Sequence, residues 1–229
     1  MASRCAESRC VASKGMAFRS AVAAASFALL AMQVFADDWG PLSRERALVQ
    51  LDSPHESERR EGLARLAEIG TEADVPYMLR RLHDDAPIVR GMAEQALWGL
   101  WLRPNDTMAN RMFQTSVVLI QQKDMERAIR QLDEIIAYKP EFAEAWNKRG
   151  DAYMQLENYD RALADYVRVL QLNPYQFSAM QSCGEIWLER RNARQAAEYF
   201  RRALELNPNL FDVALILHEL EEMLENDRI

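Results

Sequence analysis

Three prolines, Pro140, Pro174 and Pro208, divide the C-terminal half of the chain at equal intervals of 34 residues. Each proline ends a stretch in which small, aromatic and apolar residues recur in the same order. A period of this length is typical of a unit of two antiparallel helices, which is too small to bury its own apolar face and must stack on its neighbours. The period therefore predicts an all-α fold of stacked helix hairpins.

The middle copy carries the most specific motif of the three. Its repeated positions are Trp146, Arg149, Gly150, Tyr153, Ala162, Tyr166 and Leu172. The third copy keeps the spacing with Met180, Cys183, Gly184, Trp187, Ala196, Phe200 and Leu206. The first copy matches the motif less closely, and its residues at these positions are Met112, Thr115, Ser116, Leu119, Ala128 and Leu132. From about Ala109 onward the chain resembles a tetratricopeptide repeat protein. The resemblance implies a right-handed α-solenoid with units at 109–142, 143–176 and 177–210 and a capping helix at 211–226.

Small residues indicate how the two helices of a unit fit together. Gly150 and Gly184 need little room, so we expect the helices to approach closely at these positions. Ala162 and Ala196 supply the matching small surface on the second helix. Each proline follows a finished helix, because its ring and its missing N–H cannot continue the hydrogen-bond ladder.

A second, shorter periodicity lies between residues 53 and 101. Its positions are Arg59, Gly62, Leu66 and Ile69 and, 31 residues later, Arg90, Ala93, Leu97 and Leu100. The segment from Asp84 to Arg90 resembles the turn and first helix of a HEAT repeat, in which a turn aspartate and a helix arginine commonly approach each other. The resemblance predicts HEAT-like helical repeats over residues 37–104.

Local signals in this region also favour helices. Ser53 and Asp85 are expected N-caps, and the segment from Thr71 to Asp74 is expected to form a capping box with a shortened acid. The helical spacing of Val75, Met78, Leu79 and Leu82 then predicts one buried face.

The junction between the two repeat types has no linker. The expected helix at 107–122 has two apolar stripes, one containing Met112 and the other Val117 and Val118. A helix that is apolar on two sides is expected to be buried on two sides. We therefore expect it to close the HEAT-like unit, meeting Trp98 and Trp101, and to open the repeat array at 105–229, so that the solenoid is continuous.

The first 36 residues predict a secretory signal peptide. Four basic residues precede a charge-free run from Ser20 to Ala36, which ends in small residues before Asp37. Translation from Met16 would give a shorter version of the same signal. The prediction is a periplasmic or secreted protein cleaved near Ala36, and an organelle transit peptide is the alternative.

Charge and motif content exclude several function classes. Without the leader the chain keeps 24 of its 28 basic and 34 of its 35 acidic residues, so its net charge is about −10. No basic patch for nucleic acid, zinc motif, phosphate-binding loop or nucleophile elbow occurs. We therefore expect no catalytic residue, no metal and no cofactor. Cys183, the one cysteine after the leader, is expected to be a buried filler.

The remaining candidate site is the concave groove that the first helices of tetratricopeptide units line. By resemblance, its residues are Asn110, Phe113, Val117, Gln121, Glu144, Asn147, Asp151, Gln155, Ser178, Gln181, Glu185 and Glu189. Asn147 is the strongest candidate, because an amide can bond a peptide backbone as donor and acceptor. The acidic-to-neutral lining predicts a peptide or protein partner that is not acidic-tailed.

Two classes of function follow. The first is an exported protein-interaction scaffold that assembles or maintains a cell-envelope complex. The second is an accessory subunit of an enzyme, similar to a HEAT-type lyase subunit. An organelle-imported tetratricopeptide adaptor would differ from the first only in its location.

Overall fold

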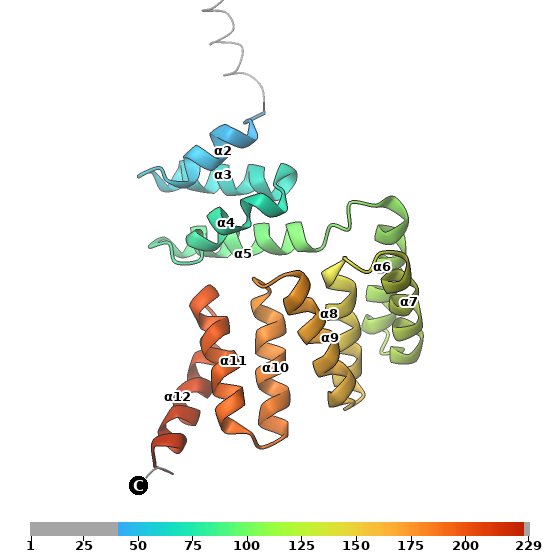
Figure 1. Ribbon diagram of the computed structural model, residues 1–229. Helices are drawn as coiled ribbons and strands as arrows, with labels where there is room; N and C mark the ends of the chain where they lie inside the picture. Colours follow the sequence, from blue (N-terminus) through green and yellow to red (C-terminus); the bar gives the residue numbers. More distant parts are fainter. Residues whose placement is uncertain (1–40, 227–229) are drawn as a thin grey trace, which may run out of the picture. The chain divides into compact units, whose positions relative to one another are not determined.

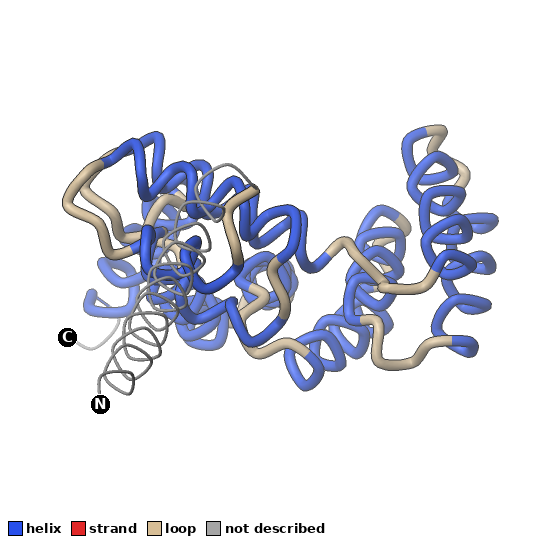
Figure 2. The backbone as a smooth tube through the Cα atoms, turned by 90° about the horizontal axis from the view of Figure 1, so that it is seen from above, coloured by secondary structure: helices blue, strands red, loops and turns tan. Residues whose placement is uncertain are grey.

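The computed structural model describes residues 41–226, which form helices and loops without a strand (Figures 1 and 2). The leader expected at 1–36 lies outside the described residues. The N-terminal helices are α2 (Arg44–Leu51), α3 (Glu56–Ile69), the short 3-10 helix η1 (Glu72–Asp74), α4 (Val75–Arg81) and α5 (Pro87–Trp101). The repeat helices are α6 (Thr107–Gln121), α7 (Met125–Tyr138), α8 (Ala143–Gln155), α9 (Tyr159–Leu172), α10 (Phe177–Glu189), α11 (Ala193–Leu206) and α12 (Phe211–Asn226). The all-α hairpin architecture is therefore confirmed.

The 34-residue period also appears in the backbone of all three repeat units. Asp124, Asn158 and Asn192 are the N-caps of α7, α9 and α11, and each side chain accepts a hydrogen bond from the N–H three residues later. The residue before each cap is left-handed, with φ between 57° and 59°. The first copy, whose sequence matches the motif least closely, shares these features, so it has the same hairpin geometry as the other two.

The close approach expected at the two glycines is confirmed. A Cβ atom added to Gly150 would lie 2.8 Å from the ring of Tyr166, and one added to Gly184 would lie 2.4 Å from the ring of Phe200. Each glycine therefore accommodates a buried aromatic ring of the second helix. The alanine expected to provide the matching surface, Ala162 in the middle unit, is buried in the same core.

The N-terminal helices form two hairpins, α2 with α3 and α4 with α5, and α3 packs on α5. The 31-residue interval recurs in their hydrogen bonds. Arg59 Nη1 donates to the carbonyl oxygens of Ser53 and Pro54 at 3.0 and 3.2 Å. Arg90 Nη1 donates to the carbonyl oxygens of the equivalent residues, 84 and 85, at 2.9 and 3.2 Å. Each arginine thus holds the turn that precedes its own helix.

Asp84, not Asp85, stabilises the turn before α5. Asp84 is 8% exposed, forms an ion pair with Arg59 at 2.8 Å and accepts a hydrogen bond from the Ala86 N–H. Burial by itself would raise the pKa of Asp84, but the hydrogen bonds from Arg59 and from the Ala86 N–H lower it below its usual value. The expected N-cap at Asp85 is therefore wrong: the N-cap of α5 is Ala86, which has no side-chain cap, and Asp84 holds the turn before it.

The other local predictions have mixed outcomes. Ser53 is not the N-cap of α3, because the helix begins three residues later and Ser53 Oγ accepts from the His55 N–H instead. The capping box of Thr71 and Asp74 is confirmed. The four apolar residues from Val75 to Leu82 are buried as expected.

The expected two-sided burial of α6 is wrong. Met108 and Val118 are 54% and 47% exposed, and α6 packs on α7 and on the edge of α8. The intervening loop contains Asn105 in a left-handed conformation (φ 51°), which redirects the chain between α5 and α6. The apolar end of α5 therefore meets a different part of the array.

Helix α5 instead lies beside the ends of the repeat helices (Figure 1). The rings of Trp98 and Trp101 contact Phe177 of α10 edge to face, at centroid distances of 5.9 and 5.5 Å. Asn209, in the loop before α12, donates to the Leu82 carbonyl oxygen at 2.9 Å. The N-terminal hairpins thus contact the first residue of α10 and the loop that follows Pro208.

Candidate partner groove

The candidate groove is formed by the first helices of the second and third repeat units, α8 and α10. Tyr166 of α9 lies between them, and its hydroxyl donates to Asp151 Oδ1 at 2.9 Å. Lys148 forms an ion pair with the other oxygen of Asp151 at 2.8 Å. Burial, and then the neighbouring Asp151, raises the pKa of Tyr166, so the hydroxyl stays protonated and fixes this carboxylate.

The expected groove residues fall into three groups. Asn110, Gln121, Gln155 and Glu189 are exposed. Val117, Asp151, Ser178, Gln181 and Glu185 are partly exposed. Phe113, Glu144 and Asn147 are buried, with exposed fractions of 1%, 1% and 3%. The accessible part of the groove is therefore smaller than the sequence suggested.

Phe113 is not a groove residue. Its ring contacts Phe142 edge to face at 5.1 Å and belongs to a core cluster with Leu132 and Ile135. An aromatic side chain gains more free energy from this burial than from exposure in an open groove. The first unit therefore contributes mainly Asn110 and Gln121 as accessible candidates.

Asn147 does not present a free amide to a ligand. Asn147 Nδ2 donates to Glu144 Oε1 at 3.0 Å, and Gln176 Nε2, in the loop before α10, donates to Glu144 Oε2 at 3.0 Å. Burial raises the pKa of Glu144 to about 7, although Lys148 and the two amides favour its charged form. Both amides are used to satisfy a buried carboxyl group.

Sequence reasoning missed Lys148 and Gln176 in this network. Lys148 lies one turn after Glu144, with its Nζ 3.8 Å from Glu144 Oε1. Gln176 directly precedes α10 and is 1% exposed. The signal available in the sequence was the spacing of Glu144, Asn147 and Lys148, which puts an acid, an amide and a cation within one helical turn.

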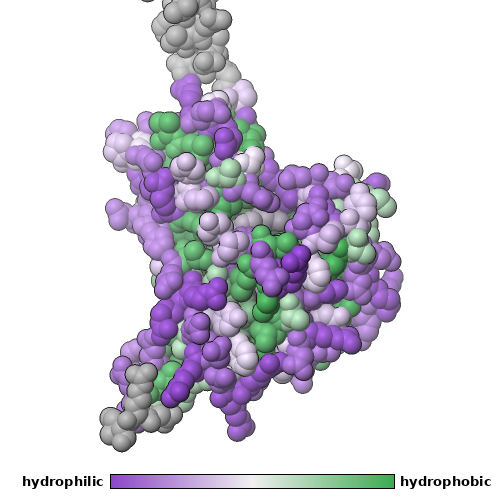
Figure 3. All heavy atoms as spheres, viewed as in Figure 1, coloured by the Kyte–Doolittle hydropathy of each residue, from purple (hydrophilic) through white to green (hydrophobic). Residues whose placement is uncertain are grey.

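The accessible lining of the groove is acidic. Asp151, Glu185 and Glu189 contribute carboxylates, while the nearby cation Lys148 is already paired with Asp151. Gln181 donates to Glu185 at 2.9 Å and leaves its negative charge in place. Most of the face shown in Figure 3 is hydrophilic, with hydrophobic patches between hydrophilic regions.

The described residues contain no group of three or more His, Cys, Asp or Glu side chains placed to hold a metal ion. Cys183 is buried as expected, and burial raises the pKa of its thiol to about 12. Among helices α2 to α12, none has the length and apolar character needed to cross a membrane. The site thus presents hydrogen-bonding and charged groups on a helical surface.

Comparisons with known proteins agree with this geometry. Residues 143–176 and 188–210 each match the family model of the tetratricopeptide repeat. A search of curated protein sequences found no match. These results define a helical repeat protein. Residues 143–176 and 188–210 are therefore tetratricopeptide repeats, whereas the HEAT-like character of α2 to α5 stays a prediction.

Solved structures with a similar fold include the first TPR of Spaghetti (RPAP3) bound to the HSP90 peptide SRMEEVD. It is 21% identical, with a TM-score of 0.50, and the match covers 52% of this chain and 96% of that one. The NMR structure of the first TPR domain of human RPAP3 is 21% identical, with a TM-score of 0.49 and coverage of 55% and 98%. The TPR2B domain of yeast Sti1 in its pHsp70 complex is 17% identical, with a TM-score of 0.48 and coverage of 52% and 99%.

Proposed function

We propose that this protein is a non-enzymatic interaction scaffold that binds a peptide or a partner protein on the groove of α8 and α10. The observation that carries the proposal is the polar surface of these two helices. Gln155, Glu185 and Glu189 remain accessible there, while a buried hydrophobic cluster around Tyr166 packs the helices together. A rigid surface binds without the cost of ordering itself, which favours recognition of a partner segment.

The structural likeness to the Spaghetti domain supports a groove ligand but not the same ligand. That domain is described with the peptide SRMEEVD, which has an acidic end. In this chain Lys148 is paired with Asp151, and the other accessible charges are carboxylates. Because like charges repel across an interface, the partner segment is neutral or basic at the end that enters the groove.

The finer part of the proposal is location. The leader at 1–36 supports export, with the scaffold helping to assemble or maintain a cell-envelope complex. N-terminal sequencing of the mature protein tests this part separately. A start near Asp37 supports export by a cleaved signal, and a start at residue 1 contradicts it.

Affinity capture from fractionated cells tests the groove. We expect a stoichiometric protein partner to copurify with the wild type and to be lost with Glu185→Arg, which reverses a charge on the groove. Glu205→Arg makes the same charge change at an exposed position of α11 and is the matched control. A partner that is retained by Glu185→Arg, or lost equally with both variants, contradicts the proposed site.

A further inference from the structure

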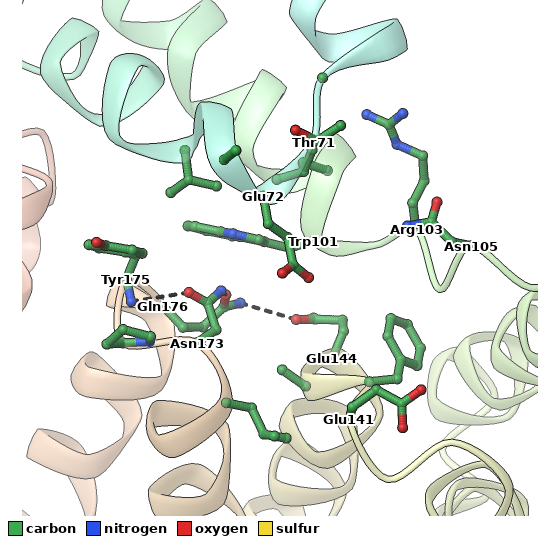
Figure 4. A pocket seen from close by; sticks show the side chains of 18 of the residues that line it. Thr71, Glu72, Trp101, Arg103, Asn105, Glu141, Glu144, Asn173, Tyr175 and Gln176 are labelled. Carbon is green, nitrogen blue, oxygen red and sulfur yellow. Dashed lines mark hydrogen bonds between the residues drawn. The ribbon is translucent and has the colours of Figure 1, made fainter.

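A cavity of about 880 Å³ lies between the N-terminal hairpins and the repeat units (Figure 4). One wall is the turn between α3 and α4 together with the end of α5, including Glu72 and Trp101. The other wall is formed by the loops before α8 and α10 and the first turn of α8, including Glu144, Asn173 and Gln176. The volume is in the range of pockets that hold small molecules or short peptide segments.

The charge of the lining is strongly one-sided. Four carboxyl groups line the cavity, from Glu68, Glu72, Glu141 and Glu144, against one cation, Arg103. Arg103 uses three of its five N–H donors for backbone carbonyl oxygens of α3 and α5 at 2.7 to 3.0 Å. Because carboxyl groups outnumber this one cation in the lining, an anionic ligand is disfavoured.

One of the four carboxyl groups, that of Glu72, is available to a ligand. Glu68 and Glu141 have basic neighbours at 2.7 and 3.5 Å. Glu72 has no ion-pair or hydrogen-bond partner for its carboxylate among residues 41–226, and it extends from the N-terminal wall toward the repeat wall (Figure 4). Glu144 lies on that opposite wall, but it is 1% exposed, each of its oxygens accepts one amide hydrogen bond, and Lys148 Nζ lies 3.8 Å from Oε1. It is therefore not a free ligand group.

Apolar groups complete the lining. Trp101 and Phe142 contribute aromatic rings, and Leu100 and Leu172 contribute aliphatic side chains. An aromatic face attracts a cation, and apolar walls favour an alkyl chain. We propose that the cavity binds an ammonium or guanidinium group carried on an alkyl stem, with its charge at the Glu72 carboxylate. The source is either a lysine or arginine side chain of a partner protein or a free alkylamine.

Titration of the full chain, labelled with ¹⁵N, tests this proposal. The probes are n-butylammonium and the peptide acetyl-Ala-Arg-Ala-amide, and the neutral controls are n-butanol and the same peptide with citrulline in place of arginine. The readouts are the Trp101 indole N–H and the Gln176 side-chain amide, which line the cavity. We expect both signals to shift with the charged probes. Glu72→Gln should weaken binding by about tenfold, because it removes a charged hydrogen-bond acceptor.

Two control variants separate this site from the general acidity of the chain and from the groove. Glu205→Gln removes the same charge from an exposed position of α11, and we expect it to leave the dissociation constant unchanged. Glu185→Arg alters the groove, and it should also leave the cavity signals unchanged, so failure of the groove proposal is distinguishable from failure of this one.

The outcomes also identify the source of the ligand. Tighter binding of the arginine peptide supports a protein segment, and binding of butylammonium at least as tight as the peptide supports a free amine. The proposal is overturned if neither charged probe moves the Trp101 and Gln176 signals. It is equally overturned if the neutral controls bind as well as the charged probes, or if Glu72→Gln and Glu205→Gln have the same effect.

Discussion

Two glycine-to-alanine variants, each of which adds one methyl group, measure how closely the two helices of a repeat fit together. Gly184 and Gly91 both lie inside helices, so replacement by alanine gains the same helix propensity of about 1 kcal/mol at each. At Gly184 the new Cβ would lie 2.4 Å from the Phe200 ring, about 1 Å inside an ordinary contact. At Gly91 no atom lies within 4 Å.

The difference between the two variants isolates the steric clash. Overpacking a buried contact costs about 1–3 kcal/mol. We therefore expect Gly91→Ala to raise the free energy of unfolding by about 0.5–1 kcal/mol, and Gly184→Ala to be about 2 kcal/mol less stable than Gly91→Ala. Urea denaturation followed by circular dichroism measures both. In a Phe200→Leu background, the cost of Gly184→Ala should shrink.

An equal or higher stability of Gly184→Ala than of Gly91→Ala would refute this account of the hairpin contact. The same holds if the Phe200→Leu background leaves the cost of Gly184→Ala unchanged, because the ring would then not be the group that the methyl meets.

Three further predictions follow from buried groups. Asp84→Asn should lower the free energy of unfolding by about 2–3 kcal/mol, because it leaves Arg59 without its buried partner, whereas Asp85→Asn should change it by less than about 0.5 kcal/mol in urea denaturation. The pKa of Glu144 is raised to about 7 in the folded protein. Its contribution to the free energy of unfolding is therefore fully present below about pH 4.5 and is lost as the pH rises to 7. This loss is at most about 3 kcal/mol, and Glu144→Gln should flatten the measured profile of stability against pH; an unchanged slope would count against the burial of this carboxyl group. Cys183, with a thiol pKa near 12, should resist iodoacetamide at pH 7.5 until the protein is unfolded, and rapid labelling of the native protein in a peptide map would contradict its burial.

The repeat units are predictable from the sequence because their contacts are local. Gly150 and Tyr166, like Gly184 and Phe200, are 16 residues apart, so the residues that meet belong to one hairpin and return with the period. The N-caps at 124, 158 and 192 follow the same interval and were available in the sequence as one aspartate and two asparagines.

The position of the N-terminal hairpins is not predictable in this way. The contacts of Trp98 and Trp101 with Phe177 join residues more than 70 positions apart, and no local period encodes them. The apolar pattern shows that the end of α5 is buried, but it does not show against which surface. That surface depends on the direction of the loop containing Asn105, whose left-handed conformation is not evident from a hydrophobic pattern.

The candidate groove was only partly predictable for a related reason. Periodicity identifies the face of a helix, so Gln155, Glu185 and Glu189 were placed correctly on an accessible side. It does not show which polar residues of a helix bond each other or a neighbouring loop. Glu144 of α8 accepts hydrogen bonds from Gln176, in the loop before α10, and from Asn147, so the amide of Asn147 is not free for a ligand.

Site-specific photocrosslinking of the captured partner tests the central claim most directly. A photoreactive residue at Gln155 or Glu189 lies on the proposed groove, and one at Ala164 lies at an exposed position of α9, the second helix of its repeat unit. The account predicts a covalent adduct with the partner from positions 155 and 189 and none from position 164. An adduct from position 164 alone would show that the partner binds elsewhere and would contradict the proposed groove.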